Sequence, residues 1–144
     1  MADRSLGMLE DKDAIREVLA RYCFALDDGR FADMAACFTE DGTWHTAFGK
    51  ATGRAAIAEF AAGLRAHRPG VQPRAIHHVT NVVITLDGDS AKVRSNWTTV
   101  QNSPDGPKIG SGGAYDDDLV KAKLEPDCAR WLEYGRSGFD PRAH

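Results

Sequence analysis

Two short segments of this chain, fifty residues apart, carry side chains that could together perform acid–base chemistry. The first, residues 21–27, closes an amphipathic helix and contains the phenol of Tyr22 and the carboxylate of Asp27. The second, residues 75–81, opens the most β-like stretch and contains the imidazole of His77. These groups suffice to take a proton from carbon and to hold a developing oxygen charge, without a metal or a cofactor. The sequence therefore indicates a cofactor-free site, provided that the three side chains meet in space.

The two adjacent histidines of the second segment cannot both serve one site. Successive side chains of a strand point to opposite faces, so His77 shares a face with Asn81 and His78 lies on the other. We therefore select His77 as the catalytic group and Asn81 as a polar residue of its pocket, and we predict no metal site. The alternative is that both histidines are hydrogen-bonded residues of the core or of an interface.

The position of Asp27 also requires a partner. Asp27 lies near the C-terminal end of its helix, where the helix dipole disfavours negative charge, and a protonated His77 would balance it. Tyr22 lies five residues earlier, roughly 140° around an ideal helix, so spacing alone does not bring both side chains to one face. The alternatives are that Tyr22 packs in the core and that Asp27, with Asp28, caps the turn.

The elements that must position these residues are helical in the first half of the chain and β-rich in the second. In chain order, the expected elements are a helix at about 13–26, a short helix over 31–38, a turn at 39–42, a strand at 43–48, a helix opened by Gly53, a loop at 65–74, and strands at 75–86, 91–101, 109–124 and 128–134. Helices followed by hairpin-connected strands predict an α+β domain, with the helices on one face of an antiparallel sheet.

The composition is that of an ordinary globular protein. The 144 residues are 42% apolar and 27% charged, which suits a single domain, 1–144, with a core at about 11–134 and a flexible tail at 135–144. A net charge of −3 without a basic cluster argues against nucleic-acid binding. Neither a signal sequence nor a membrane-spanning apolar run is found, so we expect a cytoplasmic protein. Its three cysteines are expected to be reduced and mostly buried: Cys23, Cys37 and Cys128.

The strand that begins at residue 75 is apolar on both faces. One face carries two apolar residues and the other four: Val79 and Val83, against Ile76, Val82, Ile84 and Leu86. In a sheet covered by helices on one side only, a second apolar face suggests a contact with another subunit. We therefore expect a homo-oligomer, either a dimer or a trimer.

Several motifs, in this order, resemble the SnoaL-like group of the nuclear transport factor two-like (ketosteroid isomerase-like) superfamily. They extend from about residue 11 to 134 and are Arg21-Tyr22 with Ala25-Leu26-Asp27, Phe38-Thr39-Glu40-Asp41-Gly42, Gly53-Arg54 with Ile57, His77-His78-Val79-Thr80-Asn81, and Gly113-Ala114-Tyr115. The resemblance implies a cone-shaped α+β barrel, a curved antiparallel sheet wrapped around three N-terminal helices with a deep apolar pocket. The superfamily hosts many activities, so the fold alone does not define the reaction.

Two groups within this superfamily, bile acid 7α-dehydratase and hexachlorocyclohexane dehydrochlorinase, place a catalytic Asp and His where Asp27 and His77 stand. The bile acid enzyme also has a Tyr at the position of Tyr22, whereas the dehydrochlorinase has a Lys there. Scytalone dehydratase is similar in fold but arranges its tyrosines differently. The resemblance thus implies a dehydratase-type lyase in which His77 is the general base, Asp27 orients it and Tyr22 donates a hydrogen bond.

The substrate implied by this reasoning is a small hydrophobic ring compound. Four aromatic side chains would form the walls of its pocket, although packing in the core is the more common role for such residues: Trp44, Phe60, Trp97 and Tyr115. The same base could serve an isomerase or a polyketide cyclase, and a non-catalytic binding or subunit protein is a further alternative.

Two charged groups rank lower as sites. Residues 116–118 are three consecutive aspartates, which alternate faces in a strand and are expected at a solvated edge. Arg130 and Arg136 lie on the last predicted strand and could bind an anionic group of a substrate or pair with surface acids.

Overall fold

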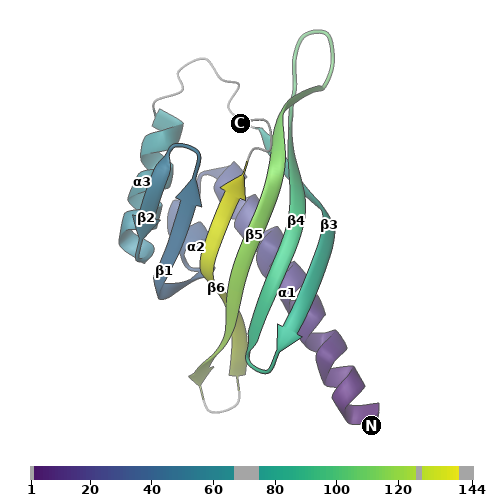
Figure 1. The fold of residues 1–144 in the computed structure, drawn as a ribbon. Coiled ribbons are helices and arrows are strands. Elements are labelled where there is room, and N and C mark those ends of the chain that lie inside the picture. The colour runs from purple at the N-terminus through teal and green to yellow at the C-terminus, as the bar shows by residue number, and fades with distance from the viewer. Residues whose placement is uncertain (1, 67–74, 126–127, 140–144) are drawn as a thin grey trace.

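A six-stranded sheet carries the helices on one face (Figure 1). The computed structural model describes residues 2–66, 75–125 and 128–139. In chain order, the elements are α1 (Ala2–Asp28), α2 (Phe31–Ala35), β1 (Phe38–Thr46), β2 (Gly49–Thr52), α3 (Arg54–Ala66), β3 (Ile76–Asp87), β4 (Ser90–Gln101), β5 (Lys108–Glu125) and β6 (Cys128–Phe139). The strand order β2-β1-β6-β5-β4-β3 is antiparallel except between β1 and β6. The predicted α+β cone is confirmed, although the curved sheet does not close into a barrel.

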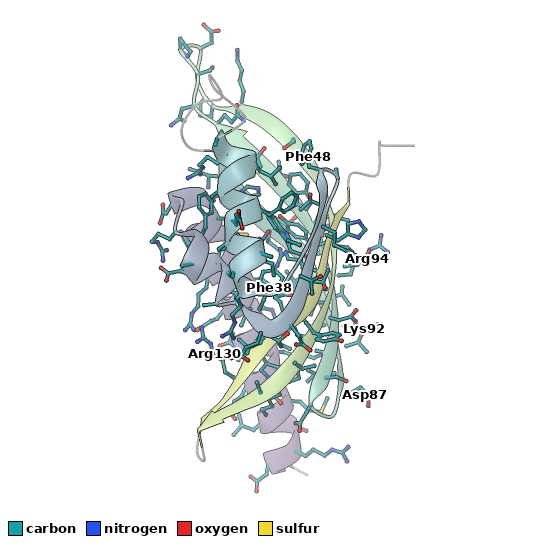
Figure 2. All side chains as sticks on the ribbon, turned by 90° about the vertical axis from the view of Figure 1, so that its left-hand side faces the viewer. Phe38, Phe48, Asp87, Lys92, Arg94 and Arg130 are labelled. Carbon is teal, nitrogen blue, oxygen red and sulfur yellow. The ribbon has the colours of Figure 1, made fainter. Side chains whose placement is uncertain are left out.

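The helices divide the inner face of the sheet between them. Helix α1 crosses behind β3 to β6, while α3 packs on β1 and β2 and is joined to α1 through α2 (Figure 1). The outer face carries exposed charged side chains such as Lys92 and Arg94, whereas Phe38 is completely buried beneath the helices (Figure 2). The core therefore lies between the helices and the concave face of the sheet.

A β-bulge in β3 changes which of its residues face the core. Thr80 pairs with Asn96 and Val83 with Arg94, so two residues of β3, Asn81 among them, stand opposite a single residue of β4. Asn81 adopts a positive φ of 55°, a conformation that Asn tolerates better than most residues. Because the bulge adds one residue, His77 and Val79 before it and Val82, Ile84 and Leu86 after it all lie on the more buried side.

This bulge corrects the expectation of two apolar faces. Strict alternation placed Val79 with Val83, but the structure leaves Val83 64% exposed and turns Val79 toward the core. The outer side of β3 is consequently less apolar than the sequence indicated. The expectation of a homo-oligomer loses this support and stays a prediction.

Helix α1 is much longer than its apolar stripe predicts. The stripe of buried residues begins at Ile15, yet the helix starts at Ala2 because its first turns extend past the sheet and need no apolar face. Leu6, Met8 and Leu9 are accordingly exposed. Asp11 fixes the helix at the sheet by accepting a hydrogen bond from Trp131 Nε1 at 2.9 Å and pairing with Lys121 at 2.8 Å.

Strand β1 begins earlier than predicted. The sequence predicts Phe38 in the second helix and residues 39–42 in a turn. In the structure residues 38–42 belong to β1, because Phe38 pairs with Glu133 of β6. The register between β1 and β6 shifts between Phe38 and Thr43, so the turn-like residues form an irregularity within the strand. The short strand β2 was not predicted, and the helix after Gly53 is confirmed.

The C-terminal segment is also more ordered than expected. The predicted tail at 135–144 is wrong for residues 135–139, because Gly135 to Ser137 pair with both β1 and β5. Residues 140–144, most of the predicted loop at 65–74 and the turn at 126–127 lie outside the described residues. Cys23 and Cys37 are free and buried as predicted, whereas the side chain of Cys128 is outside the described part. None of the described helices has the length and apolar character of a membrane span.

Candidate active site

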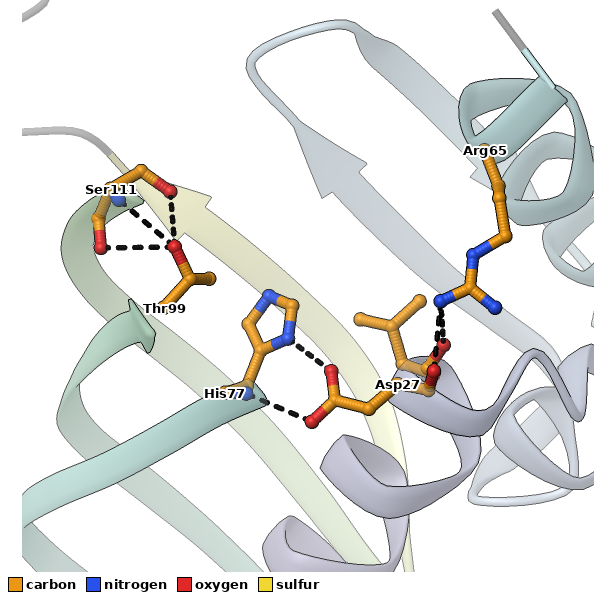
Figure 3. Close-up of polar contacts among 6 residues, drawn as sticks. Asp27, Arg65, His77, Thr99 and Ser111 are labelled. Atoms are coloured by element: carbon orange, nitrogen blue, oxygen red, sulfur yellow. Dashed lines mark hydrogen bonds and ion pairs between the residues drawn. The ribbon is translucent and has the colours of Figure 1, made fainter. Parts of the chain in front are cut away.

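The structure brings Asp27 and His77 into direct contact (Figure 3). The Asp27 carboxylate accepts two hydrogen bonds from the same residue, one from the backbone N–H of His77 at 2.8 Å and one from its ring Nδ1 at 2.5 Å. Because an ionised carboxylate can only accept, Nδ1 carries a proton and the lone pair of the neutral imidazole stays on Nε2. The two side chains are 12% and 19% exposed, so the pair is shielded but reachable.

Asp27 is held at this position by the end of α1. The helix ends in a Schellman motif, in which the N–H groups of Gly29 and Arg30 return to the carbonyls of Leu26 and Ala25. Gly29 supplies the left-handed conformation with a φ of 74°. The helix therefore ends at Asp28, one residue after Asp27, and the Asp27 carboxylate lies beside the start of β3.

A residue that the sequence did not single out, Arg65, completes this helix end (Figure 3). Its Nη2 donates to the carbonyls of Asp27 at 2.8 Å and Leu26 at 3.3 Å, and its guanidinium group lies over the ring of Phe31. A Cβ on Gly29 would stand 2.5 Å from Arg65 Nη1, so this approach also depends on the glycine. The positive charge offsets the partial negative charge of the helix C-terminus beside Asp27.

A mostly apolar cavity of about 520 Å³ adjoins the pair between α1 and β3. Its walls combine aliphatic side chains, one aromatic side chain and a few polar groups: Arg16, Leu19, Ala20, Cys23, Phe24, Asp27, Asp28, Ile76, His77, His78, Val79 and Val82. This volume is within the range typical of small-molecule sites. A hydrogen-bonded acid–base pair thus opens on a space that could receive an apolar ligand.

The four aromatic side chains predicted as pocket walls do not line this cavity. They form a continuous aromatic cluster deeper in the cone, starting from His77, whose ring lies 5.9 Å from that of Trp97. The ring of Trp97 stacks on that of Tyr115, with 5.7 Å between the ring centroids. The rings of Trp44 and Phe60 meet edge to face, also with 5.7 Å between the centroids, and Tyr22 joins the two pairs. Trp44, Trp97 and Tyr115 come from strands and Phe60 comes from α3, and their rings contact one another or His77. Their role as walls of a substrate pocket stays a prediction.

Tyr22 lies in the middle of this cluster, away from the lining of the cavity. Its ring contacts those of Phe38, Trp44 and Tyr115 at centroid distances of 6.1 to 6.4 Å. Burial raises the pKa of the Tyr22 phenol well above its ordinary value, so the hydroxyl is always protonated. The predicted role as a hydrogen-bond donor stays a prediction, since the described contacts connect Tyr22 to His77 only through Tyr115 and Trp97.

The remaining predicted polar residues lie at the surface. Asn81, predicted as a pocket residue, is exposed within the bulge of β3, because its positive φ removes it from the face of His77. His78 is exposed and borders the cavity, and His45 is exposed on β1. The structure therefore supplies His77 with a different polar neighbour.

That neighbour is Thr99, which stands directly opposite His77 on β4 and was not predicted. Its hydroxyl accepts a hydrogen bond from the backbone N–H of Ser111 at 2.9 Å and lies 3.0 Å from the Ser111 hydroxyl (Figure 3). The hairpin turn at residues 87–90 sets this register, with the one-residue offset of the bulge. The turn signal predicts the hairpin, but only the bulge decides that Thr99 is the partner.

A second group of ionisable residues is buried in the core beneath the aromatic cluster. Arg136 is sandwiched between Tyr22 and Tyr115, with its guanidinium carbon 3.8 Å from each ring centroid. It pairs with Glu133 at 3.1 Å and with Asp117 at 3.5 Å, and all three side chains are completely buried. The prediction that Arg136 binds substrate or pairs with surface acids missed this arrangement, because its acidic partners are internal.

Burial dominates the electrostatics of this group. It raises the pKa of Asp117 to about 6 despite the opposing charge of Arg136, and it raises the pKa of Glu133 well above its ordinary value. The consecutive aspartates do alternate faces as predicted, since Asp116 and Asp118 are exposed, but β5 is a central strand rather than a solvated edge. Among the described residues, no three His, Cys, Asp or Glu side chains gather as possible metal ligands.

Comparison with known proteins places this geometry in context. A family model described as a SnoaL-like domain matches residues 7–131. A search of curated proteins found no significant match. Among solved structures, Rv3472, a protein of unknown function from Mycobacterium tuberculosis, is 29% identical with a TM-score of 0.80, and the match covers 94% of this chain and 75% of that one.

Two further solved structures are similar to this chain, one with an enzyme name and one with a bound ligand. A candidate scytalone dehydratase from Novosphingobium aromaticivorans is 25% identical with a TM-score of 0.71, covering 96% of this chain and 87% of its own. A protein from Catenulispora acidiphila, solved in complex with S-DNPA, is 25% identical with a TM-score of 0.75, covering 90% and 94%. These findings support the general part of the functional prediction, that this chain is a kind of enzyme that converts small molecules without a cofactor.

Proposed function

This chain belongs to the SnoaL-like family of the nuclear transport factor two-like superfamily, and we propose that it is a cofactor-independent lyase of the dehydratase type. Its substrate would be a small hydrophobic cyclic compound in the cavity between α1 and β3. One observation carries the proposal: Asp27 holds the Nδ1–H of His77, which leaves Nε2 as a free base beside an apolar space. A neutral imidazole suits proton abstraction near pH 7.

In the proposed reaction, His77 Nε2 removes a proton from a ring carbon next to a carbonyl group. The electron pair of the broken C–H bond forms an enolate, which expels a hydroxyl group from the neighbouring carbon and becomes a double bond. The imidazolium returns its proton to the departing hydroxyl, which leaves as water. Asp27 favours both stages because it fixes the reactive tautomer and stabilises the transient positive charge on the ring.

Trp97 and Tyr22 have supporting roles in this proposal. Trp97 is the aromatic ring in contact with the His77 ring, at 5.9 Å, and would limit how far a planar substrate can enter. Tyr22 would donate a hydrogen bond to the enolate oxygen, as the family resemblance implies. Tyr22→Phe tests this role: a donor predicts a roughly 10²-fold lower kcat with unchanged folding, as measured for other oxyanion donors, whereas a packing role predicts unchanged kinetics.

Base strength at His77 can be measured before the natural substrate is known. The elimination of 5-nitrobenzisoxazole needs only a base in an apolar site and releases a yellow phenolate, so its rate reports Nε2 directly. We expect His77→Gln to lower kcat/KM by about 10²–10⁴-fold. His78→Gln is the matched control, because it removes the neighbouring exposed imidazole and should leave the rate within about twofold. Equal losses in both variants would refute the assignment of His77.

A panel of ring β-hydroxyketones then identifies the reaction. Loss of water from the substrate, detected by mass spectrometry, indicates the lyase. Exchange of substrate hydrogen for deuterium without loss of water indicates the alternative, an isomerase or a cyclase that uses the same base. Stabilisation by ring ligands without turnover on any substrate indicates the remaining alternative, a non-catalytic binding protein.

A further inference from the structure

A second cavity, of about 500 Å³, lies on the other side of α1 and has a different character. Its lining contains three arginines together with a short set of small, acidic and apolar residues: Arg21, Phe24, Ala25, Arg30, Asp33, Ala36, Cys37 and Arg130. The arginines come from α1, from the link between α1 and α2, and from β6, so only the fold assembles them. Phe24 lines both cavities.

Among the described residues, two of these guanidinium groups pair only with exposed acids. Arg21 pairs with Glu17 at 2.9 Å, and both side chains are more than half exposed. Arg30 pairs with Asp33 at 2.6 Å and with Asp28 at 3.6 Å, also at the surface. Exposed pairs of this kind are weak and screened by salt, so an anion that contacts several arginines at once can displace the acids.

The third guanidinium group, that of Arg130, has no hydrogen-bond or ion-pair partner among the described residues. Its Nε is buried and has no hydrogen-bond acceptor among the described residues, and no described acid forms an ion pair with it. Arg130 is close enough to Cys37 to act on the pKa of that thiol, which burial nevertheless raises. The Nε is closed to solvent, so a ligand in the cavity would meet the terminal N–H groups of Arg130, for which no described residue provides an acceptor either.

We propose that this arginine-lined cavity binds the phosphate group of a small organic phosphate. A phosphate monoester presents three oxygens and nearly two negative charges, which suits three arginines that line one cavity better than a carboxylate does. The aromatic ring of Phe24, which is 66% exposed at the rim, would contact the organic part. This site is separate from the His77 cavity and does not depend on the proposed reaction.

Phenyl phosphate is the probe for this site, measured by isothermal titration against the wild-type chain at low and high salt. We expect saturable binding to one site, weakened by salt, and affinity at least tenfold lower for benzoate. Arg130→Gln should weaken the binding of phenyl phosphate by roughly tenfold or more, the usual effect of losing a charge-assisted hydrogen bond. Arg21→Gln, on a surface turn of α1, should weaken it too and covers the case in which Arg130→Gln does not fold.

Two matched variants remove one arginine each from other places. Arg94→Gln removes an exposed arginine from the outer face of the sheet (Figure 2) and should leave the affinity unchanged within about twofold, since Arg94 does not line the cavity. Arg16→Gln removes the arginine that lines the His77 cavity and should behave likewise. The proposal is overturned if no binding occurs, if Arg94→Gln weakens it equally, if Arg16→Gln is the sensitive variant, or if benzoate binds as tightly.

Discussion

The molecule contains two groups of paired acidic and basic side chains that differ in burial, in hydrogen bonding and in access to a cavity. The His77–Asp27 pair lies at the boundary between α1 and β3, where both carboxylate oxygens are satisfied, the ring is 19% exposed and a cavity adjoins it. The Arg136 group lies in the core, where all side chains are sealed from solvent. Several of its polar atoms, among them both carboxylate oxygens of Asp117, have no hydrogen-bond partner among the described residues.

The difference separates a group that can react from one that can only hold the fold. A general base must keep a free lone pair where a substrate can reach it, and His77 meets this condition because Asp27 occupies the other nitrogen. Arg136 is enclosed by two tyrosine rings and two acids, so its charge is engaged internally. Substitutions in the first group should therefore change rates, and those in the second should change stability.

The largest expected effect tests the first half of this contrast. Asp27→Asn should lower kcat/KM by about 10²–10⁴-fold, the full contribution of a general base, because the amide no longer fixes the proton on Nδ1. The free energy of unfolding, measured in urea, should change by far less than the activation free energy that corresponds to this loss of rate. Asp28→Asn is the control, since it alters the neighbouring acid at the same helix end. A similar loss of rate in Asp28→Asn would mean that charge near the cavity, and not the tautomer of His77, matters.

The second prediction tests the buried group. Arg136→Met should lower the free energy of unfolding by about 3–5 kcal/mol, because it leaves two carboxyl groups buried without a counter-ion. Arg94→Met, on the exposed outer face, should change stability by no more than about 0.5 kcal/mol. Urea unfolding measures both. If Arg136→Met changed the free energy of unfolding only slightly but greatly lowered the reaction rate, Arg136 would act in the reaction and the contrast between the two groups would be wrong.

The third prediction concerns pH. In the folded chain the pKa of Asp117 is about 6, above its ordinary 3.8. The folded state therefore holds this proton more tightly, and the stabilisation is complete below about pH 4 and is lost as the pH rises through 6. Relative to Asp117→Asn, the wild-type chain should lose about 1–3 kcal/mol of unfolding free energy between pH 4 and pH 7. Asp116→Asn, on the exposed side of β5, should show no such difference.

The smallest effect tests the link between the helix end and the His77–Asp27 pair. Gly29→Ala forces a side chain into a left-handed conformation and displaces Arg65, whereas Gly88→Ala, with a φ of 58° and open space around it, has the conformational cost alone. We expect about 1–2 kcal/mol of destabilisation for Gly88→Ala and about 1 kcal/mol more for Gly29→Ala. Equal losses, measured by thermal unfolding, would mean that Arg65 does not hold Asp27.

Much of the fold followed from local patterns. The α+β class, the three helices and the long hairpins are predicted correctly because helical and alternating periodicities, with their turn residues, are encoded within short windows. The errors fall where a distant partner overrides the local signal. Residues 39–42 resemble a turn but join β1 because β6 pairs alongside them, and residues 135–139 resemble a tail but complete β6.

The candidate site divides in the same way. The sequence by itself determined that Asp27 lies at a helix end and needs a partner, and that His77 opens a strand on the face opposite to His78, because the helix dipole and strand alternation act locally. Only the tertiary structure decided that they meet, that Arg65 supports the helix end, and that the bulge at Asn81 turns this residue away and sets Thr99 opposite His77. It likewise decided which arginines are buried and which surround a cavity. Contacts between residues far apart in the chain depend on how the layers pack, and no single segment contains that information.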